Sequence, residues 1–266
     1  MINLSSKGTL FEAVHDKKAK EGVHMITYKI ISKTGSRPVN EDSTGMHQVG
    51  DSYGFFLADG LGGHGKGDVA SKTAIEQAIL QFEQGGNTEE TLRNVFEAGQ
   101  AGVLEQQRIA GNSQGMKTTL TAVLLDQQSI RWGHIGDSRI YYFLNNKLVC
   151  RTMDHSVPQM LVAAGEIKEK EIRHHPDRNR LLRVIGVEEE TLRYQLAEPV
   201  TRRGRQAFLL CSDGFWELID EKEMTTLLKK TKSVEQWVDE MEVLVRRHGY
   251  GTNMDNYSAV AIWVDM

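Results

Sequence analysis

The sequence has few of the features that would place it in an oxidising or a membrane environment. Its 266 residues include only two cysteines and four prolines. Cys211 lies inside an apolar run, so we interpret both thiols as the reduced cysteines of a cytoplasmic protein rather than as a disulfide framework. No apolar stretch approaches the roughly 20 residues that cross a bilayer, and the first residues lack the basic start and apolar core of a signal peptide.

A surplus of positive charge is also missing. The net charge of −4 leaves no broad basic surface, so neither nucleic acid nor an anionic membrane is expected as the principal partner. Proline-rich linkers, low-complexity segments and internal repeats are absent from the sequence, and its length allows a substantial core. We therefore expect one domain over residues 25–266, after a lead at 1–24 with no assigned function. Since no heptads occur, a monomer is expected.

Hydrophobic periodicity predicts a mixture of helices and strands. Amphipathic patterns predict helices at 66–84, 88–110, about 220–230 and 233–247. Apolar runs predict strands at 25–32, 53–58, 118–125, 129–135, 139–144, 147–151, 207–211 and 258–264. The links between the middle strands are only a few residues long, which permits antiparallel hairpins and excludes parallel crossovers. The expected fold class is therefore α+β with antiparallel sheets.

The stretch 53–67 joins an apolar run to an acid and a glycine-rich loop. Asp59 ends the run, and four further glycines follow Gly60 within seven residues. Glycine is used where the backbone needs positive φ or where another group approaches it closely. A strand that delivers an acid into such a loop is suited to holding a cation or an oxyanion.

A dinucleotide site is the alternative for this stretch. Gly60, Gly62 and Gly65 match the G-x-G-x-x-G fingerprint, and Glu83 lies at about the distance of the ribose-binding acid. The fingerprint needs a second strand that ends at this acid. Residues 66–84 keep helical spacing instead, which disfavours the dinucleotide hypothesis.

Acidic residues recur where the predicted strands end or begin. Singly, each resembles an ordinary turn residue, because a small or amide residue follows it. These acids are Asp59, Asp137, Asp213 and Asp255, with Asp42 added from the first loop. Carboxylates that are brought together repel one another, and Mg²⁺ or Mn²⁺ with all-oxygen ligands offsets that repulsion. No cysteine and histidine cluster has the spacing of a zinc site.

Two such ions close together promote the in-line attack of water on a phosphoryl group. The phosphate then needs a cation to orient its remaining oxygens. Arg37 precedes Glu41 and Asp42 by a few residues, and a guanidinium can bind phosphate through two hydrogen bonds. The alternative for Arg37 is a solvated loop charge.

Six short motifs occur in one order along the chain. They are RPVNED (37–42), DGLGGH (59–64), GDSR (136–139), DHS (154–156), SDG (212–214) and DN (255–256). In this order and spacing, from about residue 25 to 264, the sequence resembles the bacterial form of the metal-dependent protein phosphatases of type 2C. The resemblance implies a four-layer α-β-β-α sandwich of two antiparallel sheets flanked by helices. It also implies a signalling enzyme, a hydrolase of phosphoserine and phosphothreonine in proteins that a serine/threonine kinase has phosphorylated.

The resemblance also implies the ligands of two Mn²⁺ or Mg²⁺ ions. Asp59 would bridge both ions, and the Gly60 carbonyl would add to one of them. Asp213 and Asp255 would hold the other ion. The nucleophile would be the water or hydroxide that the two ions share.

Further residues receive roles in the same way. Glu41 and Asp42 would act mostly through bound waters. Asp137, together with Asp213, matches the position of a third metal in bacterial members. Arg37 would bind the substrate phosphate.

The sequence departs from the family at one catalytic position. Several eukaryotic members carry a histidine two residues after the bridging aspartate, as the proposed general acid, and Leu61 stands there in this chain. His64, His155 or a metal-bound water are the alternatives. A rival hypothesis for the whole protein is a catalytically silent module that binds phosphoproteins, although Asp59 and the other core acids are present.

Residues 157–180 correspond to the variable flap of the family. Its basic residues are Arg173, His174, His175, Arg178 and Arg180. Loops over a rigid scaffold commonly carry specificity, so this charge is expected to attract phosphorylated or acidic substrates. The alternative is a solvated surface.

Overall fold

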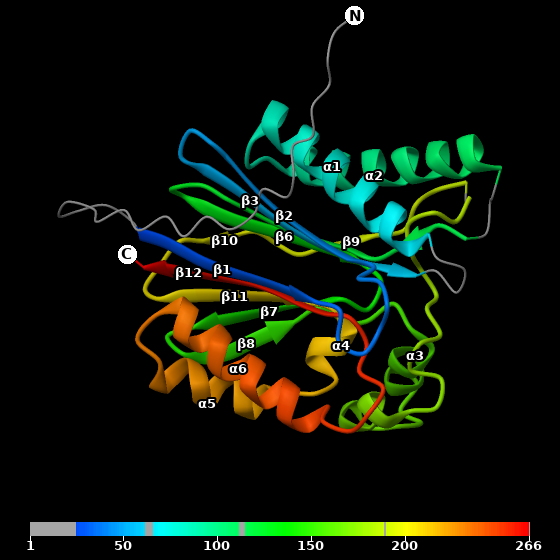
Figure 1. Ribbon diagram of the computed structural model, residues 1–266. Helices are drawn as coiled ribbons and strands as arrows, with labels where there is room; N and C mark the ends of the chain where they lie inside the picture. The colour runs from blue at the N-terminus through cyan, green and yellow to red at the C-terminus, as the bar shows by residue number, and fades with distance from the viewer. Residues whose placement is uncertain (1–24, 62–65, 112–114, 189, 266) are drawn as a thin grey trace, which may run out of the picture.

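The computed structural model describes residues 25–61, 66–111, 115–188 and 190–265. Two antiparallel sheets are stacked face to face, and helices lie on both outer sides (Figure 1). The predicted α+β class and the four-layer sandwich are therefore confirmed. The lead at 1–24 and the predicted Gly62, His64 and Gly65 lie outside the described residues.

The first sheet follows the order β10-β6-β5-β3-β2, with β4 pairing to β3 and β9 to β6. Its strands are β2 (Asp42–Val49), β3 (Ser52–Leu61), β4 (Lys117–Thr118), β5 (Leu120–Leu125), β6 (Ser129–Ile135), β9 (Gln195–Leu196) and β10 (Val200–Thr201). Helices α1 (Gly67–Gly85) and α2 (Glu89–Ala110) cover its outer face (Figure 1). Since Glu83 lies within α1, the dinucleotide alternative lacks its second strand.

The second sheet follows the order β1-β12-β11-β7-β8. Its strands are β1 (Met25–Lys33), β7 (Arg139–Leu144), β8 (Lys147–Arg151), β11 (Gln206–Cys211) and β12 (Tyr257–Asp265). Helices α5 (Glu221–Lys230) and α6 (Val234–His248) cover its outer face, and the short α4 (Asp213–Trp216) precedes them. The segment after β8 contains α3 (Val157–Ala163) and the 3₁₀ helix η1 (Glu169–His174).

Successive side chains of the central strands are buried on opposite faces. In β3, Phe55 and Leu57 pack between the two sheets, whereas Phe56 and Ala58 pack beneath α1 and α2. Burial on both faces explains why these strands appear in the sequence as unbroken apolar runs. None of the helices in the described ranges is both long and apolar enough to cross a bilayer.

Around the predicted acids, three features differ from the prediction. β3 continues to Leu61 instead of ending at residue 58, so Asp59 and Gly60 belong to the strand. β2 was not predicted, because it is an edge strand, mostly only half-buried, and therefore lacks an apolar run. The short helix α4, which Asp213 opens, was not predicted either.

Candidate active site

Two of the predicted acids come from neighbouring strands. Asp42 opens β2 and pairs directly across the ladder with Asp59 of β3. Residues that face each other in an antiparallel pair have Cβ atoms about 4.5–5.5 Å apart, which is destabilising for two like charges. The hairpin turn at the far end of this strand pair sets the register. Gly50 lies in that turn with φ 57°, a left-handed conformation that favours glycine.

Two further acids belong to the second sheet. Asp213 follows β11 by one residue, and Asp255 precedes β12, which is hydrogen-bonded to β11. The carboxyl group of Asp213 is close enough to that of Asp59 for its charge to raise the pKa of Asp59. Ser212 joins the two sheets directly, because its hydroxyl donates a hydrogen bond to Asp42 Oδ2 at 2.8 Å. The sandwich therefore gathers acids that are widely separated in the sequence.

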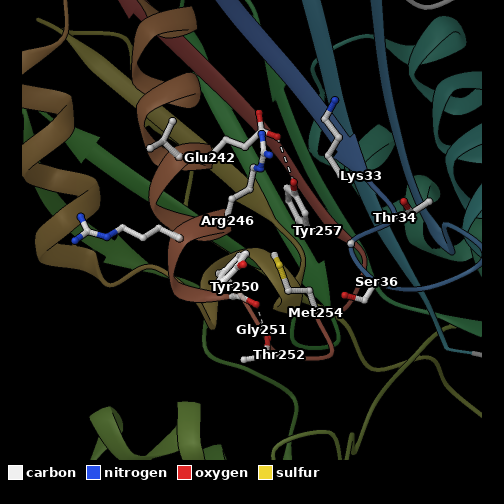
Figure 2. Close-up of a pocket in the computed structure, with 14 residues that line it drawn as sticks. Lys33, Thr34, Ser36, Glu242, Arg246, Tyr250, Gly251, Thr252, Met254 and Tyr257 are labelled. Atoms are coloured by element: carbon white, nitrogen blue, oxygen red, sulfur yellow. Dashed lines mark hydrogen bonds between the residues drawn. The ribbon is translucent and has the colours of Figure 1, made fainter.

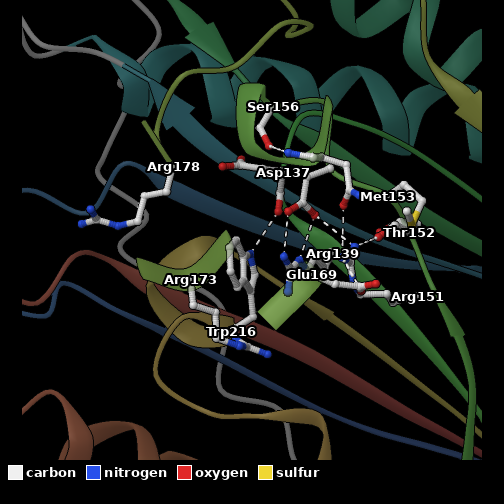
Figure 3. Close-up of polar contacts among 12 residues, drawn as sticks. Asp137, Arg139, Arg151, Thr152, Met153, Ser156, Glu169, Arg173, Arg178 and Trp216 are labelled. Atoms are coloured by element: carbon white, nitrogen blue, oxygen red, sulfur yellow. Dashed lines mark hydrogen bonds and ion pairs between the residues drawn. The ribbon is translucent and has the colours of Figure 1, made fainter. Parts of the chain in front are cut away.

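Asp137 lies in the turn between β6 and β7, which carries the chain from the first sheet to the second. Its carboxyl group is close enough to those of Asp59 and Asp213 to influence their charge. Its backbone carbonyl accepts a hydrogen bond from Trp216 Nε1 at 3.0 Å (Figure 3). Trp216 ends the same short helix that Asp213 begins. One indole thus ties the Asp137 turn to the helix of Asp213.

A buried ion pair supports this indole (Figure 3). Arg139 donates from Nε and Nη2 to the two carboxylate oxygens of Asp154, at 2.8 and 2.7 Å. The side chains of Arg139 and Asp154 are 3% and 1% exposed. The Arg139 guanidinium lies 3.4 Å from the centroid of the Trp216 ring. Because two parallel hydrogen bonds fix the plane of the guanidinium, they also fix the ring that stacks on it.

The predicted flap, 157–180, is anchored to the region that follows Asp213. Arg173 Nη2 donates a hydrogen bond to Glu221 Oε1 at 2.7 Å. Arg178 pairs with Glu217 at 2.9 Å. Two arginines of the predicted basic surface therefore have acidic partners, and less of their charge is available to a substrate.

The surroundings of the clustered acids favour their protonated forms. Burial raises the pKa of Asp42 and of Asp213 to about 7, although the hydrogen bond from Ser212 opposes the shift at Asp42. Burial and then the charges of the neighbouring carboxylates raise the pKa of Asp59 well above its usual range. Burial, with Asp213 nearby, does the same to the pKa of Asp137. A positive charge among these groups would offset their repulsion.

Two buried carboxylate oxygens in the cluster have no hydrogen-bond partner among the described residues, Asp42 Oδ1 and Asp137 Oδ1. Unpartnered carboxylate oxygens in an all-oxygen site suit a hard divalent cation such as Mg²⁺ or Mn²⁺. Within the ranges that the structure describes, no three His, Cys, Asp or Glu side chains already form a metal-ligand set. The donor chemistry therefore fits the ions.

Gly60 occupies a position with no room for a side chain. A Cβ atom there would lie 2.3 Å from the carbonyl oxygen of Gly67 and 2.6 Å from that of Glu41. The close approach lets Gly60 N donate a hydrogen bond to the Glu41 carbonyl at 3.1 Å. The Glu41 carboxylate accepts a hydrogen bond from Gly67 N, the first residue of α1, at 3.3 Å, and burial raises its pKa. Glu41 thus lies next to the cluster but is bound to the start of a helix.

Arg37 is bound to one of the predicted metal ligands. Its Nη2 donates a hydrogen bond to Asp255 Oδ2 at 2.8 Å, and the two side chains are 45% and 39% exposed. Asn256 holds the loop of Arg37 in place: its Nδ2 donates to two carbonyls in the 34–39 segment, both at 2.9 Å. Its Oδ1 accepts from Glu41 N at 2.8 Å. Arg37 therefore lies at the exposed rim of the acid cluster.

Three residues that hold parts of the site in place could not be identified from the sequence. Ser212 and Asn256 stand in two of the six motifs and Trp216 lies three residues after Asp213, but none of them was assigned a role. Closeness to a motif acid was the signal available for them. Their hydrogen-bond partners depend on how the two sheets pack, which the sequence does not display.

His155 is not arranged to act as a general acid. Its Nδ1 accepts a hydrogen bond from Gly136 N at 3.2 Å, and its ring stacks on His134 with centroids 4.5 Å apart. Burial lowers the pKa of His155 to about 3 and that of His134 to about 4. Both imidazoles are therefore neutral at neutral pH. The other candidate, His64, lies outside the described residues.

Comparisons with known proteins show what the whole chain is similar to. The family model described as protein phosphatase 2C matches residues 32–256, a range that includes every acid of the cluster. The serine/threonine phosphatase Stp of Listeria welshimeri is 31% identical over 233 residues, which cover 84% of this chain and 89% of that protein. The crystal structure of the Mycobacterium tuberculosis serine/threonine phosphatase PstP/Ppp aligns with a TM-score of 0.78 and 30% identity, over 92% of this chain and 100% of that chain. The catalytic domain of PstP in complex with two manganese ions aligns with a TM-score of 0.75 and 27% identity, over 92% and 100%.

Proposed function

The chain belongs to the protein phosphatase 2C family and is a serine/threonine protein phosphatase of that type, and from this premise we propose how it acts. It removes phosphate from phosphoserine and phosphothreonine in proteins by in-line attack of water on phosphorus, with two Mn²⁺ or Mg²⁺ ions as cofactors. The family is metal-dependent. When bound, the two cations supply an activated water and neutralise charge on the phosphoryl oxygens.

The observation that carries this proposal is the gathering of carboxylates from both sheets at one end of the sandwich, with two buried oxygens unpartnered among the described residues. Asp59 would hold both ions, because the charges of the four other acids all act on its carboxyl group. The carbonyl of Gly60 would be a further ligand of one ion. Asp213 and Asp255, which flank the neighbouring strands β11 and β12, would hold the other.

The remaining acids act around this pair of ions. Glu41 and Asp42 orient water molecules, and the Ser212 hydroxyl fixes the direction of Asp42. Asp137, with Asp213, forms a third and weaker cation site. The unpartnered oxygen of Asp137 supports this assignment.

Arg37 binds the phosphate of the substrate. In the structure its guanidinium is held by Asp255, one of the assigned ligands. The hydrogen bond to Asp255 uses one nitrogen of the guanidinium, and its other nitrogens would donate to phosphate. Its exposed position at the rim suits a residue that meets a macromolecular substrate.

The substrates in this proposal are proteins phosphorylated by a serine/threonine kinase. Residues 25–266 form the single catalytic domain, which acts as a monomer. The two cysteines are free thiols, one exposed and one buried, which suits the reducing conditions of a cytoplasm.

The test is phosphate release from a phosphothreonine peptide with Mn²⁺, with Mg²⁺ and with excess chelator. Wild type should turn over only with a metal, and Asp213→Asn, which keeps the shape of the side chain, should lose most turnover. Asp239→Asn, on the exposed face of α6, is the control and should behave as wild type.

The rival hypothesis is a module that binds phosphoproteins without cleaving them. Folded wild-type protein that binds the peptide but releases no phosphate with either metal would establish it. The retention of Asp59 and of the other cluster acids favours the enzyme.

A further inference from the structure

A groove of about 890 Å³ lies between the end of α6 and the loop that follows β1 (Figure 2). One wall consists of residues 33–36, which directly precede Arg37. Met254 and Tyr257, on either side of Asp255 in the sequence, also line it. The backbone of Ser36 is tied to this segment by a 2.9 Å hydrogen bond to the Met254 carbonyl. The groove therefore begins beside the ion pair of Arg37 and Asp255.

Cations outnumber acids along the groove. Lys33, Arg246 and Arg247 line it, against the single carboxylate of Glu242. None of the ion pairs found in the described part of the chain involves these three cations. Glu242 is itself engaged, because it accepts a hydrogen bond from Tyr257 at 3.2 Å. On a chain with net charge −4, this is a local surface of opposite sign, complementary to an acidic ligand.

The groove also offers apolar surface at its rim. Tyr250 is 89% exposed, and Val243 on the last turns of α6 is 63% exposed. Figure 2 shows Arg246 and Tyr250 on the side of α6, with Lys33 and Ser36 across from them. Exposed aromatic and arginine side chains are enriched where proteins bind other chains. Two facing walls of this kind suit an extended polypeptide segment.

We propose that this groove binds the residues that flank the phosphorylated side chain of a substrate, and that it selects acidic side chains there. The proposal rests on the proposed function, because Arg37 fixes the phosphate and thereby the position of the flanking residues. An extended chain advances about 3.3 Å per residue, so residues two or three positions away lie roughly 7–10 Å from the phosphorylated one. Lys33 and Arg246 supply the positive charge that attracts the acidic side chains of the peptide. Tyr250 packs against the aliphatic parts of those side chains.

The experiment compares two phosphothreonine peptides that are identical except that flanking glutamates are replaced by glutamines. We expect kcat/KM of wild type to favour the glutamate peptide. In the double variant Lys33→Gln/Arg246→Gln, kcat/KM for the glutamate peptide should fall about five- to tenfold, as expected for two partly exposed charge pairs. Turnover of p-nitrophenyl phosphate, which is too small to reach the groove, reports on the acid cluster and should not change.

Lys230→Gln is the matched control. It also removes a cation from the last turn of a helix, but at the end of α5 and outside the groove, so neither peptide should be affected. Equal losses for both peptides and p-nitrophenyl phosphate in the double variant would overturn the proposal. Unchanged turnover of the glutamate peptide would overturn it as well.

Peptide binding measured in the absence of turnover tests the groove independently of the reaction. Fluorescence anisotropy of the same two labelled peptides is measured with wild type and the double variant in excess chelator. A preference of wild type for the glutamate peptide that the double variant loses would support the groove, even if no metal gave phosphate release. Equal affinities of wild type for the two peptides would reject the groove while leaving the proposed reaction untouched.

Discussion

The indole nitrogen of Trp216 donates a hydrogen bond to the backbone carbonyl of Asp137 at 3.0 Å. The two residues belong to separate elements, α4 and the turn between β6 and β7. Arg139 lies against the face of the indole and is itself fixed by Asp154. The position of Asp137 therefore depends on the uncharged indole ring of Trp216.

Trp216→Phe should weaken both the fold and the reaction. The change keeps most of the ring but leaves the buried carbonyl of Asp137 without its donor, which costs about 1–3 kcal/mol. We expect a lower free energy of unfolding in urea and a lower kcat, because the Asp137 turn is no longer held to α4. Unfolding curves and phosphate release measure the two effects.

Trp237→Phe is the control for this change. Trp237 of α6 is also fully buried and donates a hydrogen bond of 3.0 Å, but to the backbone carbonyl of Met224 in α5. It should lose similar stability and keep the kcat of wild type at temperatures where it is folded. If both variants kept kcat equally, Trp216 would have a structural role only.

Arg139→Lys should be strongly destabilising. A lysine cannot make the two parallel hydrogen bonds to Asp154, and it leaves a buried carboxylate incompletely paired. Disrupting a buried pair of this kind typically costs about 3–5 kcal/mol in the free energy of unfolding. Arg108→Lys, in an exposed pair with Glu105, is the comparison and should change little. Equal losses in the two variants, measured in urea, would contradict the importance assigned to the buried pair.

His134 should make the protein sensitive to mild acid. Burial lowers its pKa to about 4, whereas an unfolded histidine titrates near 6.5. As the pH falls below about 6.5, the unfolded chain takes up a proton that the folded chain resists. The stabilisation present above that pH is therefore lost progressively towards pH 4, by up to about 3 kcal/mol.

The variant His134→Gln tests this linkage. Glutamine can still donate a hydrogen bond to the Met153 carbonyl, which His134 contacts at 2.8 Å. The free energy of unfolding of the variant should fall less between pH 6.5 and 4 than that of wild type. His174→Gln, an exposed position, should retain the full decline. An unchanged pH profile in His134→Gln would disprove the prediction.

Divalent cations should stabilise the protein more at pH 8 than at pH 6. Burial raises the pKa of Asp42 and of Asp213 to about 7, so the stability that their protonation confers is lost as the pH rises through 7 in metal-free protein. Mn²⁺ then binds ionised carboxylates and offsets their repulsion. At a hundredfold excess over Kd, the gain is about 2.7 kcal/mol.

Thermal melting with Mn²⁺ and with chelator measures this gain. Asp213→Asn should show a smaller shift of the melting temperature than wild type at both pH values. Identical shifts for wild type and Asp213→Asn would remove Asp213 from the ligand set. Shifts of the same size at pH 6 and pH 8 would show that the carboxylates are already ionised without metal.

The sequence predicted strands best where both faces of the strand are buried, because such a strand appears as an unbroken apolar run. The runs that end at Asp59 and at Asp213 could therefore be located, and so could the acids that follow them. β2 could not, since an edge strand carries no such run, and its pairing explains why Asp42 faces Asp59. The hypothesis that acids from several strand ends converge is consistent with the structure.

Side-chain partners could not be predicted. Arg37 and Asp255 are 218 residues apart in the sequence, and hydrogen bonds from Asn256 and to Met254 hold the loop of Arg37 against the start of β12. The link from Ser212 to Asp42 spans 170 residues in the same way. Such pairs depend on how the two sheets pack, and no local pattern encodes them.

Because Asp42 pairs with Asp59, the arrangement of the acid cluster also depends on a distant turn. Side chains alternate along a strand, so a shift of β2 by one residue would turn Asp42 to the opposite face of the sheet. The register is set at Gly50, at the other end of a ladder about 24 Å long. Inserting or deleting one residue in that turn would therefore change the acid cluster as directly as replacing one of its acids.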